Sequence, residues 1–314
     1  MMRKLELDAL RADVTSVNRL LRSRTQEIDP IGFLQFSRRR EQLQEKIDEL
    51  QNAPFLKGSV ALFFAGEPVS GSRGIRADFA GKAVEIFQDV VSKQFAAVEL
   101  GEMGERGPIP MKANSDLLLT DVARGSVGLV LEEAGENDTI ARTPLSIVLD
   151  RVVEMLAQTA RPERAAFDEL LEHIDQRQLV SLRNFFQHLD DAHATLRLVE
   201  GESDIIFDSA AIQRARTRTS VARIDEREDD QMNGRLYLLP GHRRFELHID
   251  GDPPTEIFGS VSREFAREHL QAMQAASDVV GKRWRVKILI RSIQRQNGEP
   301  RISYSLKGLI QRLD

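Results

Sequence analysis

The sequence predicts an α+β multidomain protein in which a helical hairpin, a mixed central domain and a small β-barrel follow one another along the chain. Three observations support this: apolar residues at helical spacing near the start, strand hairpins that alternate with helices in the middle, and five short strands in the last part. The 314 residues are 41% hydrophobic and 30% charged. A chain of this length and composition is expected to form two or three domains with packed cores.

Residues 1–53 predict an antiparallel, coiled-coil-like helical hairpin. Apolar side chains recur at alternating spacings of three and four on the first helix: Leu7, Leu10, Val14, Val17 and Leu21. This spacing is typical of a coiled-coil seam. A break before Pro30 leads into a second helix with its own apolar row, Phe33, Phe36, Leu43, Ile47 and Leu50. A hairpin of this size has too little core to be stable alone. We therefore expect the seam to pack on the body or on another copy, and we predict a homo-oligomer.

Residues 54–221 predict a central α+β domain. The expected strands are 59–66, a hairpin over 116–133 that turns at 123–126, and a hairpin over 195–207 that turns at Gly201. Thr143-Pro144 is a strong helix start, because a hydroxyl N-cap is followed by proline in the first turn. Further helices are expected after Asp78, over 163–174 and over 177–190.

Residues 222–233 are polar, mostly acidic and nearly free of apolar side chains, which predicts a linker. Residues 234–314 then predict a small β-barrel. The expected order is strands 234–241, 244–250 and 255–262, helix 262–277, and strands 281–294 and 301–311, the last two joined through Asn297-Gly298. This order is that of an OB-like Greek-key barrel, and an SH3-like barrel with an inserted helix is the alternative.

The charge is unevenly distributed. The net charge is −5, but residues 281–314 hold nine basic and two acidic residues, so a basic end follows an acidic body. The chain has no cysteine, which excludes disulfides, thiolate metal sites and a cysteine nucleophile and fits a reducing compartment. Neither a signal-peptide pattern nor an apolar run long enough to span a membrane is present, so a cytoplasmic protein without membrane contact is expected.

The basic strand of the barrel is the first candidate site. Apolar residues, with Trp284, Val286 and Ile288 among them, alternate with basic ones, so one face is expected to be core and the other cationic. A cationic groove with aromatic platforms is how OB barrels bind single-stranded nucleic acid. The candidate phosphate contacts are Arg283, Arg285, Lys287 and Arg295, and the candidate stacking residues are Tyr237 and Tyr304. The alternative is a solvated or protein-binding face, because basic residues also keep exposed strands from pairing with other chains.

The glycine-rich loop before the helix at Asp78 is the second candidate. Its residues Ser72, Arg73, Gly74 and Arg76 could hold an anion at a helix N-terminus. The loop matches no phosphate-binding motif, however, and Asp78 would compete with an anion. A strand-to-helix connection is the alternative interpretation.

Histidines and carboxylates offer two further candidates. His188 and His193 lie close in sequence to two aspartates, but no second cluster completes a metal site, so we predict no metal and no cofactor. Glu246 and His248 share one face of a predicted strand and could form an acid/base pair, with a solvated ladder of side chains as the alternative.

No catalytic motif is present. The sequence therefore predicts a non-enzymatic oligomerising scaffold or adaptor that binds a protein partner. A nucleic-acid-binding accessory protein that acts through the basic barrel is the alternative. An enzyme with an unrecognised site near 70–82 and 101–115 is a third candidate, because such sites form in space and need leave no linear motif.

Overall fold

The computed structural model describes residues 2–52, 56–101, 107–123, 127–135, 141–239, 244–251, 255–262, 265–266, 279–295 and 299–314. The chain forms two compact units. The first unit comprises Met1–Glu99, Ile109–Pro162 and Asn184–Arg216, and the second comprises Leu100–Pro108, Glu163–Arg183 and Thr217–Asp314. Within the described residues, no helix is both long and apolar enough to cross a membrane.

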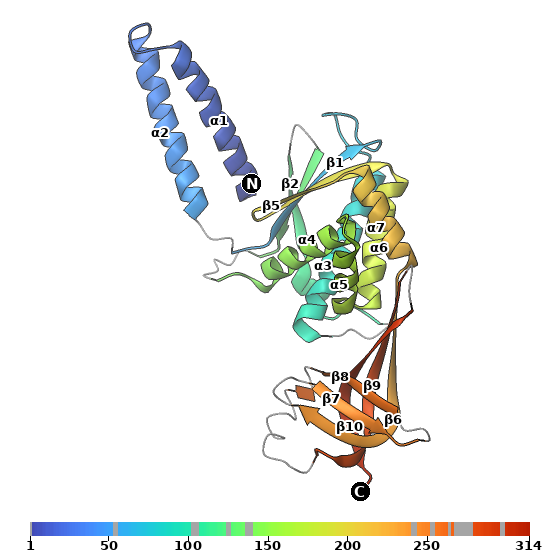
Figure 1. Ribbon diagram of the computed structural model, residues 1–314. Helices are drawn as coiled ribbons and strands as arrows, with labels where there is room; N and C mark the ends of the chain where they lie inside the picture. The colour runs from blue at the N-terminus through green and yellow to red at the C-terminus, as the bar shows by residue number, and fades with distance from the viewer. Residues whose placement is uncertain are drawn as a thin grey trace. The chain divides into compact units, whose positions relative to one another are not determined.

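The first unit is built on an antiparallel sheet (Figure 1). Its strand order is β2-β3-β1-β4-β5. Its strands are β1 (Ser59–Gly66), β2 (Leu117–Ala123), β3 (Val127–Glu133), β4 (Ala194–Glu200) and β5 (Ser203–Phe207). β1 lies in the centre, and its residues 60–64 are buried on both faces of the sheet. This burial explains why its sequence is an apolar run and not a clean alternation of apolar and polar residues.

Helices pack on one face of this sheet. They are α3 (Ala77–Leu100), α4 (Pro144–Ala160), the second half of α6 (Gln176–Asp191) and the first part of α7 (Ser209–Val221). α4 begins as predicted, since the Thr143 hydroxyl accepts a hydrogen bond from the Ser146 amide at 3.1 Å and Pro144 occupies the first position. Phe64 of β1 meets Phe79 of α3 edge to face, with ring centroids 5.3 Å apart.

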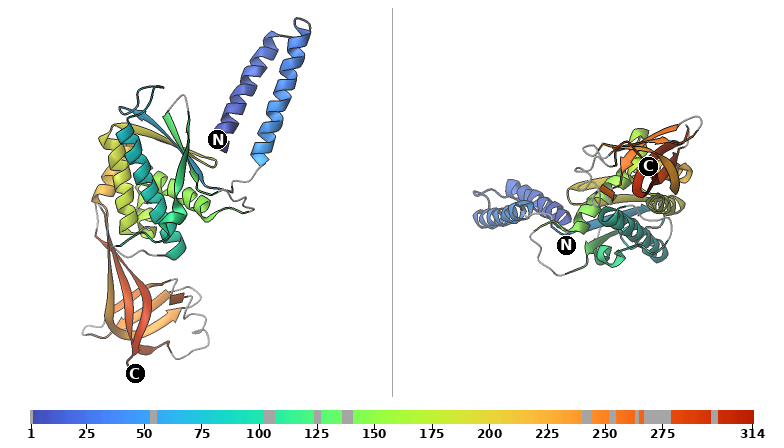
Figure 2. Two further views of the ribbon diagram at one scale, coloured as in Figure 1. Left: turned by 180° about the vertical axis from the view of Figure 1, so that it is seen from behind. Right: turned by 90° about the horizontal axis from the view of Figure 1, so that it is seen from below.

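Helices α1 (Arg3–Ser23) and α2 (Pro30–Asn52) lie side by side and run in opposite directions, as the views in Figure 2 also show. We call them the α1–α2 pair. Leu7 and Val17 of α1 and Leu43 and Ile47 of α2 are buried. Just before α1, the Met2 side chain packs against a cluster on the sheet of the first unit: Ala61, Phe63, Val130 and Val199. This contact attaches the start of α1 to the sheet.

The second unit contains a closed five-stranded barrel, as predicted for the C-terminal region. The strands are β6 (Arg223–Leu239), β7 (Arg244–Ile249), β8 (Thr255–Val261), β9 (Lys282–Gln294) and β10 (Arg301–Arg312), in the order β10-β8-β7-β6-β9. β8 and β10 pair in parallel, and the other four pairs are antiparallel. Alternating apolar side chains fill the barrel, including Leu236, Phe245, Leu247, Val286, Ile288 and Leu306.

The prediction of a linker at 222–233 is wrong. These residues form the first half of β6, which pairs with β9 from Arg223 opposite Gln294 onward. Ile224 and Ile293 face each other in this ribbon and are both buried. The segment resembles a linker because it is polar and acidic, and it is acidic where it pairs with the basic strand β9. Opposite charge across the strands therefore takes the place of the apolar alternation that usually marks a strand.

Helix α5 (Arg164–His173) belongs to the same unit as the barrel. The guanidinium of Arg291 on β9 donates hydrogen bonds to the carbonyls of Leu171, Glu172 and Ile174 at the end of α5. These carbonyls have no partner within the helix, so Arg291 satisfies them. The predicted turns at 124–126 and Asn297-Gly298, and most of the predicted helix 262–277, lie outside the described residues.

Candidate functional site

The outer face of the barrel brings aromatic and charged side chains together on β6, β7 and β8. Strand pairing aligns Tyr237, Glu246 and Phe258 in one row, and it aligns Arg235, His248 and Glu256 in the next. The residues between them along each strand point into the core, because successive side chains of a strand alternate between its faces. This face therefore holds a compact group of titratable side chains beside two aromatic rings.

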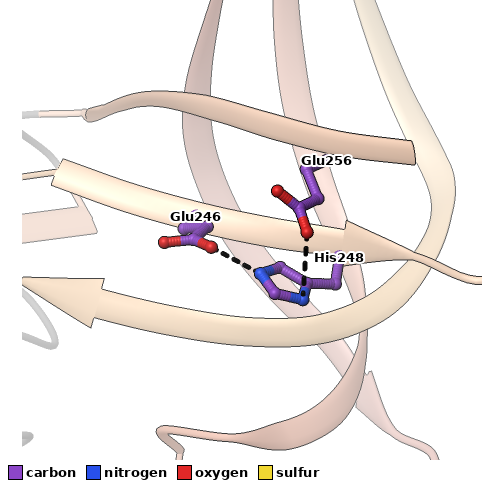
Figure 3. Close-up of side chains that lie close together, drawn as sticks. All are labelled: Glu246, His248 and Glu256. Carbon is purple, nitrogen blue, oxygen red and sulfur yellow. Dashed lines mark hydrogen bonds and ion pairs between the residues drawn. The ribbon is translucent and has the colours of Figure 1, made fainter. Parts of the chain in front are cut away.

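His248 lies between two carboxylates (Figure 3). Its Nε2 is 2.5 Å from Oε1 of Glu246, and its Nδ1 is 3.8 Å from Oε1 of Glu256 across the strand pair. The ring of Tyr237 packs beside the imidazole, with centroids 5.1 Å apart. The three polar side chains and the tyrosine ring thus form one contact group on the barrel surface.

The same three residues are a group of potential metal ligands within the described part of the chain. However, the two glutamates contact different nitrogens of one imidazole ring. The two nitrogens point in different directions, and a single ion takes only one of them as a ligand. The ring would have to turn before all three side chains could bind one ion. The geometry thus fits a contact group of three side chains better than a metal centre.

A catalytic use of the pair is also poorly supported by its surroundings. Glu246 and His248 have the hydrogen bond that orients a general base. Their side chains are 34% and 37% exposed on an open strand face, so water reaches both groups freely. An active site normally excludes water around its reacting groups.

The predicted phosphate contacts on β9 and just after it already have partners within the chain. Arg283 lies 2.5 Å from Asp250, Lys287 lies 2.7 Å from Glu228, and Arg295 lies 2.7 Å from Glu172. The Arg285 guanidinium donates to the Asn233 side-chain oxygen at 3.2 Å. A phosphate would have to displace these partners.

The two predicted stacking residues do not share a face. Tyr304 packs against the barrel core, whereas Tyr237 lies on the outer face beside His248. The structure therefore does not gather the six predicted nucleic-acid contacts into one groove.

The glycine-rich loop folds on itself. The amide of Ser70 donates to the carbonyl of Gly74 at 2.9 Å, and that of Arg73 donates to the carbonyl of Ser70 at 3.0 Å. Arg76 forms two hydrogen bonds to Asp78, at 2.6 and 3.3 Å, and this contact holds the pKa of the Asp78 carboxyl below its ordinary value. Asp78 thus occupies Arg76, one of the two arginines of the predicted anion site.

The histidine cluster after residue 187 has a structural explanation. The ring of His188 stacks on Phe79 at 4.8 Å, and its Nε2 lies 3.1 Å from the Phe79 carbonyl oxygen. His193 adopts a left-handed conformation, with φ of 48°, in the turn before β4. The adjacent Asp190 and Asp191 pair with Arg216. These contacts tie the end of α6 to neighbouring elements.

The sequence analysis did not predict one pair of neighbouring carboxyl groups, Glu200 and Asp150. Glu200 at the end of β4 is buried beside Asp150 of α4, and Arg142 pairs with Asp150 at 2.6 Å. Burial first, and then the hydrogen bond to Asp150, raises the pKa of Glu200 to about 8. Two carboxyl groups that share a proton can serve acid/base chemistry. No sequence signal could have revealed the pair, because 142, 150 and 200 lie on separate elements.

The α1–α2 pair exposes apolar side chains along the predicted seam and near the turn between its helices. Of the five seam residues only Leu7 and Val17 are buried, while Leu10, Val14 and Leu21 remain partly exposed. Near the turn between the helices, exposure rises to 74% for Ile28, 72% for Ile31 and 53% for Leu34. Exposed apolar clusters of this kind are typical of interaction surfaces.

Comparison of the chain with protein-family models, with curated proteins and with solved structures gives no match.

Proposed function

We propose that the protein is a non-enzymatic scaffold or adaptor that self-associates through the α1–α2 pair. The observation that carries this proposal is the incomplete burial of the apolar side chains on the two helices. Four of them are buried between the helices: Leu7, Val17, Leu43 and Ile47. Ten others are partly or largely exposed: Leu10, Val14, Leu20, Leu21, Ile28, Ile31, Phe33, Leu34, Phe36 and Leu50.

The energetics favour a partner on this surface. Complete burial of one such side chain contributes about 1.5–3 kcal/mol. Half of that value for each of the ten residues, summed over two copies, is about 15–30 kcal/mol, which matches or exceeds the roughly 4–15 kcal/mol that association costs in lost motion. Two helices alone form a single interface, and a second pair of helices would cover the open sides of the seam.

The described part of the chain has a small cavity in the second unit. The cavity beside α5, lined by Phe167, Leu171 and Arg295 among others, has a volume of about 40 Å³. That volume holds a few water molecules but not a substrate.

The test of self-association is a mass measurement by light scattering at micromolar concentration. We expect at least a dimer for the unmodified chain and a shift toward monomer for Val14→Glu, which places a charge in the seam. Ala12→Glu is the matched control, because Ala12 is an exposed residue of the same helix. A monomeric mass for the unmodified chain would contradict the proposal.

In this proposal the barrel is the module that docks a protein partner. The parallel pairing of its third and fifth strands supports the OB-like interpretation over the SH3-like one. Phe258 is 60% exposed on the face that also carries Tyr237, and exposed aromatic side chains are enriched at protein interfaces.

Nucleic-acid binding is the second candidate function, favoured by one observation on the same face. Arg235 and Arg244 lie there beside Tyr237 and Phe258, and neither arginine has an ion-pair partner among the described residues. In OB barrels the second and third strands carry the ligand face. Phe258→Ala should then weaken binding to single-stranded nucleic acid, whereas neutralising Arg283, Arg285 and Lys287 should not. Glu246 and Glu256, which repel phosphate, lie on the same face.

A further inference from the structure

The α1–α2 pair carries opposite charge at its two ends. The half next to the turn, residues 14–40, holds six arginines and two carboxylates, and we call it the tip half. The half farther from the turn, residues 3–13 and 41–52, holds seven carboxylates and four basic residues, and we call it the base half. The tip arginines are Arg19, Arg22, Arg24, Arg38, Arg39 and Arg40, and all are exposed.

These charges have few partners within the chain. Among the described residues, Arg24 pairs with Asp29 at 3.4 Å, and the other five tip arginines have no carboxylate within ion-pair distance. The base half shows the same pattern, because Glu41, Glu45 and Glu49 are exposed and form no ion pair within the described part of the chain. The positive and negative ends are thus separated along the helices and remain available.

We infer that the partner of the α1–α2 pair is a second copy of this chain, packed antiparallel so that each tip half lies beside the base half of the other copy. This inference rests on the proposed self-association and adds the identity and direction of the partner. An antiparallel arrangement is a two-fold interface in which both contacts join a positive end to a negative end. A parallel arrangement would place six arginines against six arginines.

In this interface the apolar residues contribute affinity, and the charges select the partner and its direction. Burial of the seam supplies most of the affinity. Exposed ion pairs are individually weak, but a whole row of them selects the partner and its direction, because the wrong direction places like charges together. The charge pattern therefore determines the antiparallel orientation, and the apolar seam determines that association occurs.

Direction can be measured by cross-linking, because the chain contains no cysteine. Ser23→Cys places one thiol at the tip end, and Gln51→Cys places one at the base end; both positions are exposed. When the two variants are mixed and treated with a short bismaleimide, we expect tip-to-base cross-links and few tip-to-tip or base-to-base products. The reverse distribution would overturn the antiparallel inference while leaving self-association intact.

Charge reversal tests the cause of the direction. The tip variant Arg38→Glu, Arg39→Glu, Arg40→Glu and the base variant Glu41→Lys, Glu45→Lys, Glu49→Lys should each weaken self-association about tenfold or more. Mixed in equal amounts, the two variants should associate with each other, because each tip again meets a base of opposite charge. Replacing the three arginines by lysine is the control and should leave the mass unchanged.

The outcomes separate the two claims. A monomeric unmodified chain would overturn the proposed function and this inference together. A dimer that both reversed variants retain unchanged, or that the mixture does not restore, would overturn only the inference that charge sets the partner.

Discussion

Charged residues are arranged differently in two regions of the molecule: the ribbon formed by β6 and β9, and the α1–α2 pair. In the ribbon an acidic strand lies beside a basic one, so Glu226 meets Arg291 and Glu228 meets Lys287 within one chain. In the α1–α2 pair most arginines lie at one end and most carboxylates at the other, and few of these charges meet within the described residues. Charge asymmetry in a sequence thus indicates an external partner only where the fold provides no internal one.

The largest expected effect comes from breaking the internal match at its buried end. Arg291→Leu removes the cation that pairs with Glu226, and the side chains of both residues are nearly buried. It also removes the donor that Arg291 supplies to the carbonyls at the end of α5. Loss of one partner of a buried pair costs about 3–5 kcal/mol. Urea denaturation should show this loss in the free energy of unfolding.

Lys287→Met is the matched control for that variant. It breaks an ion pair of the same ribbon whose side chains are 42% and 52% exposed. Exposed pairs contribute about 0–1 kcal/mol. Equal losses for Arg291→Leu and Lys287→Met would contradict the distinction between buried and exposed pairs.

A second prediction concerns two neighbouring carboxyl groups, Glu200 and Asp150, and the pH dependence of stability. Below pH 4.5, the Glu200 carboxyl is protonated in the folded and in the unfolded protein. Between pH 4.5 and its folded pKa of about 8, it stays protonated only in the folded protein. The folded state then binds more protons, so this group's contribution to stability falls as pH rises through that window. Glu200→Gln should remove this decline and stabilise the protein at pH 8 by on the order of 2 kcal/mol after allowance for solvent screening.

The pH dependence is measured as the melting temperature from pH 5 to pH 8.5. Glu202→Gln is the control, because Glu202 is an exposed residue two positions away in the turn after β4. It should leave the slope unchanged. A slope that Glu200→Gln does not alter would show that Glu200 is already ionised in the folded protein.

A third, smaller effect concerns salt and the unmatched charges of the α1–α2 pair. At about 1 M salt the screening length falls to about 3 Å, so contacts between exposed charges are weakened. The difference in dimer affinity between the unmodified chain and the Arg38, Arg39, Arg40→Glu variant should shrink from about tenfold toward none. Sedimentation at low and high salt measures it. A difference that persists at 1 M would indicate that the variant damages the helix itself.

The smallest effect is expected on the exposed face of β9. Replacing Arg283, Arg285 and Lys287 by glutamine leaves the neighbouring core positions intact, so stability should change by no more than about 0.5 kcal/mol for each residue. Because these cations have partners within the chain, the unmodified protein should show no salt-dependent affinity for nucleic acid through this strand. Steep salt dependence that the triple variant loses would support phosphate contacts on β9.

The barrel could be predicted because its strands follow a local rule. Val286, Ile288 and Leu247 alternate with polar residues, and this alternation is visible along a few positions of sequence. The helix start at Thr143-Pro144 is equally local. The first half of β6 could not be predicted, because its signal lies in the charge of a strand about 60 to 70 positions away.

The surroundings of the candidate sites depend on long-range contacts of the same kind. The sequence placed Glu246 beside His248 through their spacing of two, but Glu256 joins them only through the pairing of β7 with β8. Glu200 and Asp150 meet only after α4 packs on the sheet. Sites that depend on such long-range contacts leave no local pattern.

The pairing of Arg223 with Gln294 has a consequence for the order in which the chain folds. During synthesis the first half of β6 emerges about 70 residues before its partner, a delay on the order of 4–14 s at about 5–20 residues per second. For that time it is an unpaired strand edge, which is a template for aggregation. Its five carboxylates within 222–233 keep the waiting segment hydrated and repel the same segment of neighbouring nascent chains until β9 arrives.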